Sequence, residues 1–350
     1  MIELDHQRIL VTFLMHLGDL TLTTPFIRAL RNAAPSAHLT MLVDEKLADV
    51  VRGNPCLNEI ITIDKKGKEN NLLALWRLSK RLSRNGFDVL INLHPNERCS
   101  FIGAMTRVQK RCGTCHRLFR PRWDIFTPLD RTRHAAEMYL DVLTQLGVTR
   151  LEHQGLETFP SQEQLLAAER FWQERGISDK TPLVGFNIGS AVETKRWSAE
   201  RFALVADALA QDGFHPVFFG ANADTAMVGE ALSYMKTQAT VATGRFNIGT
   251  LIAALSRCRL LITNDSGPMH LAISRRVPIV ALYGPSHVDL YGPYTKRAIV
   301  VRADPPCTGC ASGMKHHCDD LRCMKNLTVE QTLEAARRLL NHENTGGNGI

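Results

Sequence analysis

Two strand–turn–helix units, one near each end of the chain, place the strongest constraint on its fold. The first runs over residues 8–30 and the second over residues 260–272. In each unit a short apolar strand ends at a turn that contains a glycine and an acid, and a helix follows. A helix that starts at the carboxyl end of a parallel strand offers unpaired N–H groups and partial positive charge to a phosphate. The pair predicts two α/β domains that face each other across a cleft.

The residue types at both turns suit a ligand site. In the second unit the strand ends at Asp265, the turn contains Ser266 and Gly267, and we expect a helix from about Pro268. Aspartate or serine caps a helix, glycine lets a ligand approach the backbone, and proline is accepted in the first turn. In the first unit Asp19 lies at the start of the helix. There it either handles a proton or caps the helix.

Strands and helices alternate along the rest of the chain, as a parallel sheet requires. Further strands are predicted over residues 39–43, 59–63, 87–93, 183–187, 215–219 and 278–282. Helices are predicted over residues 72–84, 134–146, 162–175, 199–211, 225–235, 248–257 and 329–340. The first strand is not followed by G-x-G-x-x-G, which argues against a dinucleotide-binding dehydrogenase. The fold class is therefore α/β, with two Rossmann-like, doubly wound domains.

Composition limits where the protein works and what it binds. The 350 residues suffice for two domains, and no apolar run approaches the roughly twenty residues that span a bilayer. Residues 1–8 contain acids and show no signal-peptide pattern, so a cytoplasmic protein is expected. The net charge of +7 is either a solvated surface or a match for an anionic partner, such as a phosphorylated glycolipid or a membrane face.

One segment concentrates much of the positive charge. Residues 107–133 contain eight lysines or arginines and two acids, with aromatic residues between them. The segment is either a solvated loop or a basic groove for the phosphates and lipid of an acceptor. A nucleic-acid groove uses the same residue types. In the groove interpretation the residues that contact the acceptor are Arg117, Arg120 and Arg122.

The nine cysteines argue against a disulfide framework in a cytoplasmic protein. Four of them form a cluster: Cys307, Cys310, Cys318 and Cys323. Four thiolates make a closed tetrahedral site for structural zinc or iron, and His316 and His317 are substitutes for one ligand. The alternative is a set of buried free thiols. Cys112 and Cys115 form a C-x-x-C without a second close pair and are expected to be structural.

Three motifs resemble those of one enzyme family. They are GDLTLTTPFIRALRNAAPSAHLTMLV, NIGSAVETKRWSAERFA and ITNDSGPMHLA. Together they resemble the lipopolysaccharide heptosyltransferases of glycosyltransferase family nine, and the resemblance covers nearly the whole chain. It implies a GT-B enzyme that transfers heptose from ADP-heptose to a lipopolysaccharide core, with inversion. It also implies a phosphorylated lipid A-core acceptor, no nucleic acid, and peripheral contact with the cytoplasmic face of the inner membrane.

The resemblance also implies a division of the chain. Its parts are an acceptor-binding domain over 1–160, a connection over 161–180, a donor-binding domain over 181–328 that includes the cysteine cluster 307–323, a helix over 329–342 that crosses back to the first domain, and a flexible tail over 343–350. In one branch of the family, four cysteines form an iron-binding finger.

Residue roles follow from the matched motifs. Asp19 corresponds to the catalytic base, Lys195 to a phosphate-binding lysine and Asp265 to an acid that contacts the donor sugar. The other residues expected at the donor are Ser190, Asp224, Ser266, Gly267 and His270, with Thr243, Gly244 and Phe246 bordering the adenine. Asp224 is placed like a ribose-binding acid, where the family often has glutamate.

The chain lacks the D-x-D of metal-dependent sugar transferases, so no catalytic cofactor is expected. Two other functions fit the same residues. One is the same fold acting with another nucleotide sugar or on a protein acceptor. The other is a non-catalytic protein that binds a nucleotide or a phosphoglycan.

Overall fold

The computed structural model describes residues 2–303, 318 and 320–344. The chain divides into two compact units, Met1–Phe159 and Pro160–Ile350. Each unit is built around a six-stranded sheet in which every pair of neighbouring strands is parallel.

The sheet of the first unit has the strand order β3-β2-β1-β4-β5-β6. Its strands are β1 (Arg8–Thr12), β2 (His38–Asp44), β3 (Glu59–Ile63), β4 (Val89–Asn92), β5 (Lys110–Gly113) and β6 (Ile125–Phe126). The chain moves outward from β1 in one direction and then from β4 in the other. In such sheets ligands bind beyond the carboxyl ends of the two strands where the direction changes. Here those strands are β1 and β4.

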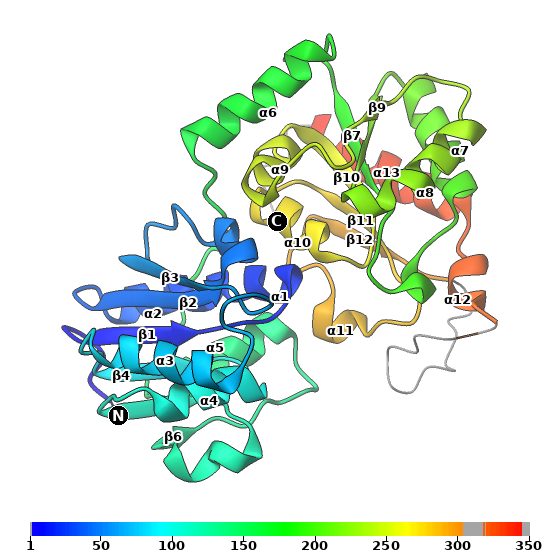
Figure 1. Cartoon of the computed structure of the whole chain (residues 1–350). Helices are drawn as coiled ribbons and strands as arrows, with labels where there is room; N and C mark the ends of the chain where they lie inside the picture. The colour runs from blue at the N-terminus through cyan, green and yellow to red at the C-terminus, as the bar shows by residue number, and fades with distance from the viewer. Residues whose placement is uncertain (1, 304–317, 319, 345–350) are drawn as a thin grey trace. The chain divides into compact units, whose positions relative to one another are not determined.

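Helices cover both faces of this sheet (Figure 1). They are α1 (Leu17–Thr21), α2 (Thr24–Ala33), α3 (Leu72–Ser83), α4 (Glu97–Met105) and α5 (Ala135–Gln145). Helix α3 packs against α4, and α2 packs against α5. Leu10 and Leu90 of the sheet share a core with Leu78 of α3 and Ile102 of α4, because alternate strand residues point to the same face.

The sheet of the second unit has the order β12-β11-β10-β7-β8-β9. Its strands are β7 (Leu183–Asn187), β8 (His215–Phe219), β9 (Thr240–Val241), β10 (Cys258–Asn264), β11 (Ile279–Leu282) and β12 (Ala298–Val301). The change of direction falls between β7 and β10. The predicted second turn therefore lies at the ligand-binding edge of this sheet.

The helices of the second unit are α6 (Gln162–Glu174), α7 (Ala199–Gln211), α8 (Thr225–Tyr234), α9 (Ile248–Leu255), α10 (Gly267–Ser274), α11 (Val288–Tyr291), α12 (Arg322–Lys325) and α13 (Val329–Asn344). Helices α7, α8 and α13 contribute to one core with the sheet. Helix α9 packs against both α6 and α10.

Two helices bear on the predicted division of the chain. Helix α6 fills most of the predicted connection and packs against α9, with Trp172 fully buried. Helix α13 packs against α7 and the strands β10, β11 and β12. Both belong by these contacts to the second unit. The crossing of the last helix to the first domain stays a prediction.

The basic segment 107–133 is not a continuous loop, but all of its lysines and arginines except Arg111 are exposed, so both interpretations given above stay open. It contains β5, a 3-10 turn η2 (Arg117–Arg122) and β6. The strands have four and two residues, and β5 begins with Lys110 and Arg111, so no apolar alternation marks them. Helix α4 was missed as well, because its residues show little separation into apolar and polar faces. In the described part of the chain, no helix combines the length and apolarity needed to cross a bilayer.

Candidate functional site

A buried asparagine organises the ligand-binding edge of the first unit. Asn92 ends β4, and its side-chain oxygen accepts a hydrogen bond from the hydroxyl of Thr12 at the end of β1 (2.8 Å). Its amide nitrogen donates to the carbonyl oxygens of His94 (2.9 Å) and Thr114 (2.7 Å). Gly113 has a φ of +88°, and a Cβ there would lie 2.2 Å from the Asn92 carbonyl oxygen. Only glycine fits this approach of β5 to β4.

Asp19 lies in α1, which follows β1 at this edge. The N-cap of α1 is His16, so Asp19 is the third residue of the helix and is half-buried. The N-cap role that the sequence left open for Asp19 is therefore wrong. A carboxylate in the first turn still interacts favourably with the helix dipole.

Lys65 fixes the segment that leads into α1. Its Nζ donates to the carbonyl oxygens of Leu14 (3.1 Å) and Met15 (3.2 Å) and lies 3.0 Å from Oδ2 of Asp44. An ammonium group has three donors, and all three have partners here. Lys65 thus ties the backbone that leads into α1 to Asp44 at the end of β2.

Two histidines and an arginine, which the sequence did not single out, lie near the same edge. His94 follows β4, and its Nδ1 accepts a hydrogen bond from the backbone of Asn96 (3.1 Å). Burial, together with the positive charge of Arg131 and the proximity of His16, lowers the pKa of His94 to about 4. His94 is therefore a neutral imidazole at neutral pH, beside the cationic Arg131. A Pro-Asn pair after a strand end is the only sequence signal for this position.

The arginines expected to bind the acceptor are on the surface. Arg117, Arg120 and Arg122 all lie in η2 and are exposed. The guanidinium of Arg120 lies 4.7 Å from the centre of the Phe126 ring and donates to the carbonyl oxygen of Trp123 (3.2 Å). Arg120 is thus partly engaged in structure, and an acceptor role for all three stays a prediction.

Cys112 and Cys115 are buried, and burial raises the pKa of their thiols to about 12 and about 11. A protonated thiol is a poor metal ligand and a poor nucleophile. This agrees with the structural role expected for the pair.

In the second unit, Asn187 at the end of β7 has the place that Asn92 has in the first. Its amide nitrogen donates to the hydroxyl oxygens of Thr263 (2.9 Å) and Ser266 (2.7 Å). Ser266 is the N-cap residue of α10, but its side chain does not cap the helix. The expected cap is wrong: the hydroxyl of Ser266 accepts from Asn187 and makes no capping hydrogen bond. The first N–H groups of α10, which starts at Gly267, therefore keep no side-chain cap.

A buried ion pair stands beside the start of α10. Lys195 Nζ lies 2.7 Å from Oδ2 of Asp265, and the two side chains are 14% and 10% exposed. The hydroxyl of Tyr283 lies 3.3 Å from Oδ1 of Asp265 and 2.8 Å from the carbonyl oxygen of Tyr291, so these two acceptors compete for its single proton. Burial and the charge of Asp265 raise the pKa of Tyr283 well above its usual value, so this hydroxyl keeps its proton. Sequence reasoning missed Tyr283, which comes directly after a short strand.

Lys195 and Lys65 differ in how many donors they use. Among the described residues, Lys195 makes one hydrogen bond, to Asp265. Two N–H donors of its ammonium group are therefore left for other acceptors. The residue lies in a 3-10 turn (Glu193–Lys195) rather than an open loop, which holds it at the sheet edge.

The other predicted donor residues are found close to this pair. The hydroxyl of Ser190 donates to the carbonyl oxygen of Asp265 (3.4 Å), and Arg196 donates to the carbonyl oxygen of Ser190 (2.8 Å). His270 lies in the first turns of α10 and is buried. The structure thus groups Ser190, Lys195, Asp265 and the start of α10 at one sheet edge.

Asp224 lies after β8, on the same edge. Its carboxylate accepts the backbone N–H of Ala221 (2.8 Å). A Cβ at Gly189 would lie 2.4 Å from that carboxylate, and one at Gly244 would lie 1.8 Å from the side chain of Asn222. The turns after β7 and β9 therefore both pack closely against the turn after β8, which contains Asn222 and Asp224.

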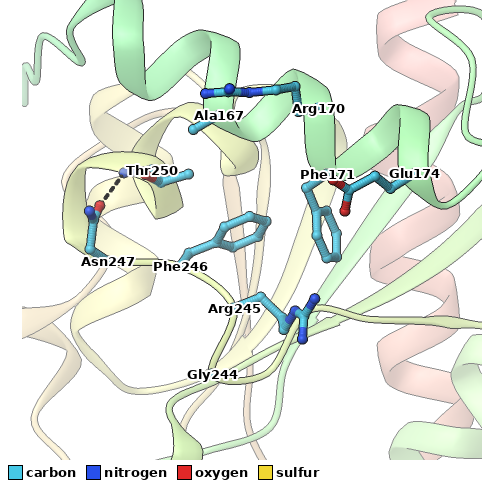
Figure 2. A pocket seen from close by; sticks show the side chains of 9 residues that line it. All are labelled: Ala167, Arg170, Phe171, Glu174, Gly244, Arg245, Phe246, Asn247 and Thr250. Atoms are coloured by element: carbon cyan, nitrogen blue, oxygen red, sulfur yellow. Dashed lines mark hydrogen bonds between the residues drawn. The ribbon is translucent and has the colours of Figure 1, made fainter.

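A pocket of about 530 Å³ opens next to Gly244. Figure 2 shows that it lies between α6 and the segment that leads into α9. The rings of Phe171 and Phe246 meet edge to face, with centroids 4.8 Å apart. Arg170 and Arg245 also line the pocket. Its lining of aromatic rings and polar groups suits a flat heterocycle.

The predicted metal cluster falls mainly outside the described residues. Cys307 and Cys310 lie in the range 304–317, which the structure does not describe. Cys318 is half-buried, and Cys323 is buried in the core of the second unit. Within the described ranges, no three histidine, cysteine or acidic side chains come together to hold a metal.

The lowered pKa of His94 gives a prediction for stability. Unfolding restores a pKa near 6.5, so below that pH the unfolded state binds more protons than the folded state. Stability is then lost as the pH falls from about 6.5 toward about 4. Between about pH 7 and pH 4.5, the wild type should lose about 1 to 3 kcal/mol more unfolding free energy than His94→Asn, measured by urea denaturation. An NMR titration that places the His94 ring near pH 6.5 in the folded protein would contradict this.

Comparison with known proteins identifies the family. The model of glycosyltransferase family 9 (heptosyltransferase) matches residues 75–317. The crystal structure of a glycosyl transferase family 9 protein from Veillonella parvula DSM 2008 is 46% identical, with a TM-score of 0.91, and the match covers 97% of this chain and 99% of that chain.

Two proteins of Escherichia coli are also similar. Lipopolysaccharide heptosyltransferase 3 of strain K12 is 28% identical over 302 residues, which are 81% of this chain and 84% of that protein. The structure of ADP-heptose lps heptosyltransferase II has 22% identity and a TM-score of 0.79, over 96% of this chain and 99% of that chain. The predicted family and the GT-B fold are both confirmed. The chain belongs to glycosyltransferase family 9, the heptosyltransferases, and is a glycosyltransferase enzyme.

Proposed function

We propose that the enzyme transfers heptose from ADP-heptose to a lipopolysaccharide core, with inversion at the anomeric carbon. The observation that carries the proposal is the buried pair of Lys195 and Asp265 beside the uncapped start of α10. The names of the two Escherichia coli relatives support the heptose donor and the lipopolysaccharide acceptor. The work would take place at the cytoplasmic face of the inner membrane.

Diphosphate binding explains the pair of Lys195 and Asp265 better than a contribution to folding stability does. A salt bridge this buried gains little net stability, because desolvation of two charges offsets their attraction. Lys195 still has two donors for phosphate oxygens, and the first N–H groups of α10 add more. These groups would take up the negative charge of ADP as it leaves. Asp265 orients the ammonium group and is available to the donor sugar.

The nucleoside of ADP-heptose would lie along the same edge of the second sheet, beside the ends of β8 and β9. Asp224 would accept hydrogen bonds from ribose hydroxyls, as an acid after such a strand does. The adjoining Gly244 leads to the pocket with Phe246, which offers a surface for the adenine. A crystal structure with ADP tests this placement, and adenine density elsewhere would contradict it.

The transfer needs one proton acceptor. The acceptor hydroxyl attacks the anomeric carbon and forms the new glycosidic bond while the bond from that carbon to the diphosphate oxygen breaks. The hydroxyl proton passes to the carboxylate of Asp19, and ADP leaves with the bonding electrons. Lys65 would help to keep Asp19 in position through its hydrogen bonds to the backbone of Leu14 and Met15.

Asp19→Asn should bind the donor nearly as tightly as the wild type and turn over at least about a hundredfold more slowly, because amide nitrogen and oxygen do not accept the proton. Transfer is measured as ADP release, with donor binding followed by calorimetry. Glu45→Gln, at an exposed acid in the same unit, serves as the control and should keep its activity. Near-normal turnover of a folded Asp19→Asn protein would rule out Asp19 as the base and would favour the non-catalytic binder.

Lys195→Ala should weaken ADP binding by about tenfold to a hundredfold, since one or two charge-assisted hydrogen bonds to phosphate are lost. The change also leaves Asp265 without its cation, so a second variant is required. Tyr283→Phe removes the other contact to Asp265 and keeps the lysine. It should lower stability and leave ADP affinity within about twofold. Equal loss of affinity in both variants would mean that Lys195 acts only through Asp265.

We also propose that the cysteine cluster holds one structural zinc or iron. Cys318 and Cys323 lie at the described end of this cluster, just before α13. A closed four-thiolate site contributes to folding and has no open position for substrate. Elemental analysis should find about one metal per chain, and Cys310→Ser should release it with loss of thermal stability. Cys56→Ala, in the first unit, should retain it. Metal-free protein with four alkylated cysteines would leave them as ordinary thiols.

A further inference from the structure

The outer face of α3 carries a feature that transfer chemistry does not use. The helix buries Leu75, Leu78 and Leu82 toward the core of the first unit. On the other side it exposes three large apolar side chains within five residues. Leu72 is 68% exposed, Leu73 is 55% exposed and Trp76 is 45% exposed. Exposed apolar groups gathered in this way mark an interaction surface.

Positive charge surrounds these side chains. The four cationic residues on α3 and its C-cap are all exposed: Arg77, Lys80, Arg81 and Arg84. Residues 72–84 contain no acid. The ammonium of Lys80 lies 5.4 Å from the centre of the Trp76 ring. The nearest acid along the chain, Glu69, lies 3.7 Å from Arg81 and is largely covered.

The spacing places both kinds of residue on one surface. At 3.6 residues per turn, Leu72, Trp76 and Lys80 follow one another along one side of α3. Leu73 begins the adjacent line, which continues through Arg77 to Arg84. The apolar side chains thus occupy the start of the helix, with cations beside and after them. Apolar side chains with cations beside them suit the boundary of an anionic bilayer, where acyl chains and charged headgroups lie close together.

We propose that this face of α3 docks on an anionic phospholipid bilayer. The leucines would enter the boundary between headgroups and acyl chains, and the Trp76 ring would lie at headgroup level, where indole is favoured. The lysine and arginines would contact anionic headgroups. A second copy of the chain is a poorer occupant, because a symmetric contact through this face would bring two basic clusters together.

The face adjoins the edge that carries Asp19. Strand β3 ends at Ile63 and α3 starts at Leu72, so the apolar end of α3 is at the carboxyl edge of the sheet. Lys65, between the two elements, donates to the backbone that precedes α1. If the proposed function holds, docking brings this edge to a lipid-linked acceptor. The membrane contact itself does not depend on that function.

Tryptophan fluorescence gives a specific test on the full chain. Trp123, Trp172 and Trp197 are 4%, 0% and 2% exposed, so a change in emission on vesicle binding reports mainly Trp76. We expect a blue shift and co-sedimentation with vesicles of phosphatidylcholine and phosphatidylglycerol, and neither with phosphatidylcholine alone. The binding should weaken as salt is raised, because headgroup charges are screened. Trp76→Phe should abolish the shift and retain co-sedimentation.

Matched variants distinguish vesicle binding through this face of α3 from nonspecific adsorption of the protein. Leu73→Gln combined with Trp76→Gln should lower vesicle affinity by at least about tenfold, and Arg77→Gln combined with Lys80→Gln should do the same. The controls are Leu204→Gln, at a leucine of α7 that is 44% exposed, and Lys180→Gln, at an exposed lysine of the second unit. Both controls should bind vesicles like the wild type.

Three results would overturn the proposal. They are no preference for anionic vesicles, vesicle binding that the α3 variants leave unchanged, or a dimer in solution that Leu73→Gln with Trp76→Gln dissociates. Transfer to a delipidated, water-soluble acceptor should be the same in the wild type and the α3 variants. Failure of transfer with every acceptor, while vesicle binding persists, would refute the proposed function and leave the membrane surface standing.

Discussion

Buried asparagines at the ends of strands hold both candidate edges together. Asn92, Asn187 and Asn264 end β4, β7 and β10, and each is almost fully buried. Asn264 repeats the pattern of the other two, since it donates to the carbonyl oxygen of Ile188 and accepts from the backbone of Trp197. Past the last ladder bond the strands no longer pair, so side-chain amides must satisfy the adjoining loops. A buried amide without partners costs about 1 to 3 kcal/mol, which makes each arrangement hard to alter.

Two half-buried lysines show how one type of ion pair has two different roles. Lys65 and Lys195 each contact a buried aspartate at a sheet edge. Lys65 donates its remaining N–H groups to backbone carbonyl oxygens, and these hydrogen bonds fix a loop. Within the described residues, Lys195 keeps its remaining donors, and the uncapped start of α10 is adjacent. The number of donors in use, rather than the burial of the charge, distinguishes the structural lysine from the candidate ligand-binding one.

The sequence predicted the parts of this structure that depend on local pattern. Strands of about five mostly apolar residues and helices with one apolar face were placed within a few residues. The short strands β5, β6, β9 and β12 were missed, because two to four residues give no period. The cap by Ser266 failed for a different reason. Its hydroxyl faces Asn187, a hydrogen-bond donor 79 residues away in the chain. Likewise, the pKa shifts of His94 and Tyr283 arise from burial and neighbouring charges, which depend on the folded structure.

The proposed donor and the proposed acceptor need different kinds of binding surface. Each unit of the chain carries one of them. A nucleotide sugar arrives from water and must be held by directed charge, which the edge of the second unit supplies with few exposed groups. A lipid-linked hydroxyl is confined to a bilayer, so affinity for the acceptor itself matters less than residence at the same surface. Leu72, Leu73 and Trp76 would provide that residence. Confinement raises the effective concentration of acceptor without any added contact to its sugar. Exposed leucines would favour aggregation in an enzyme that stays in water. On α3 they would instead keep the enzyme at the bilayer that holds the acceptor.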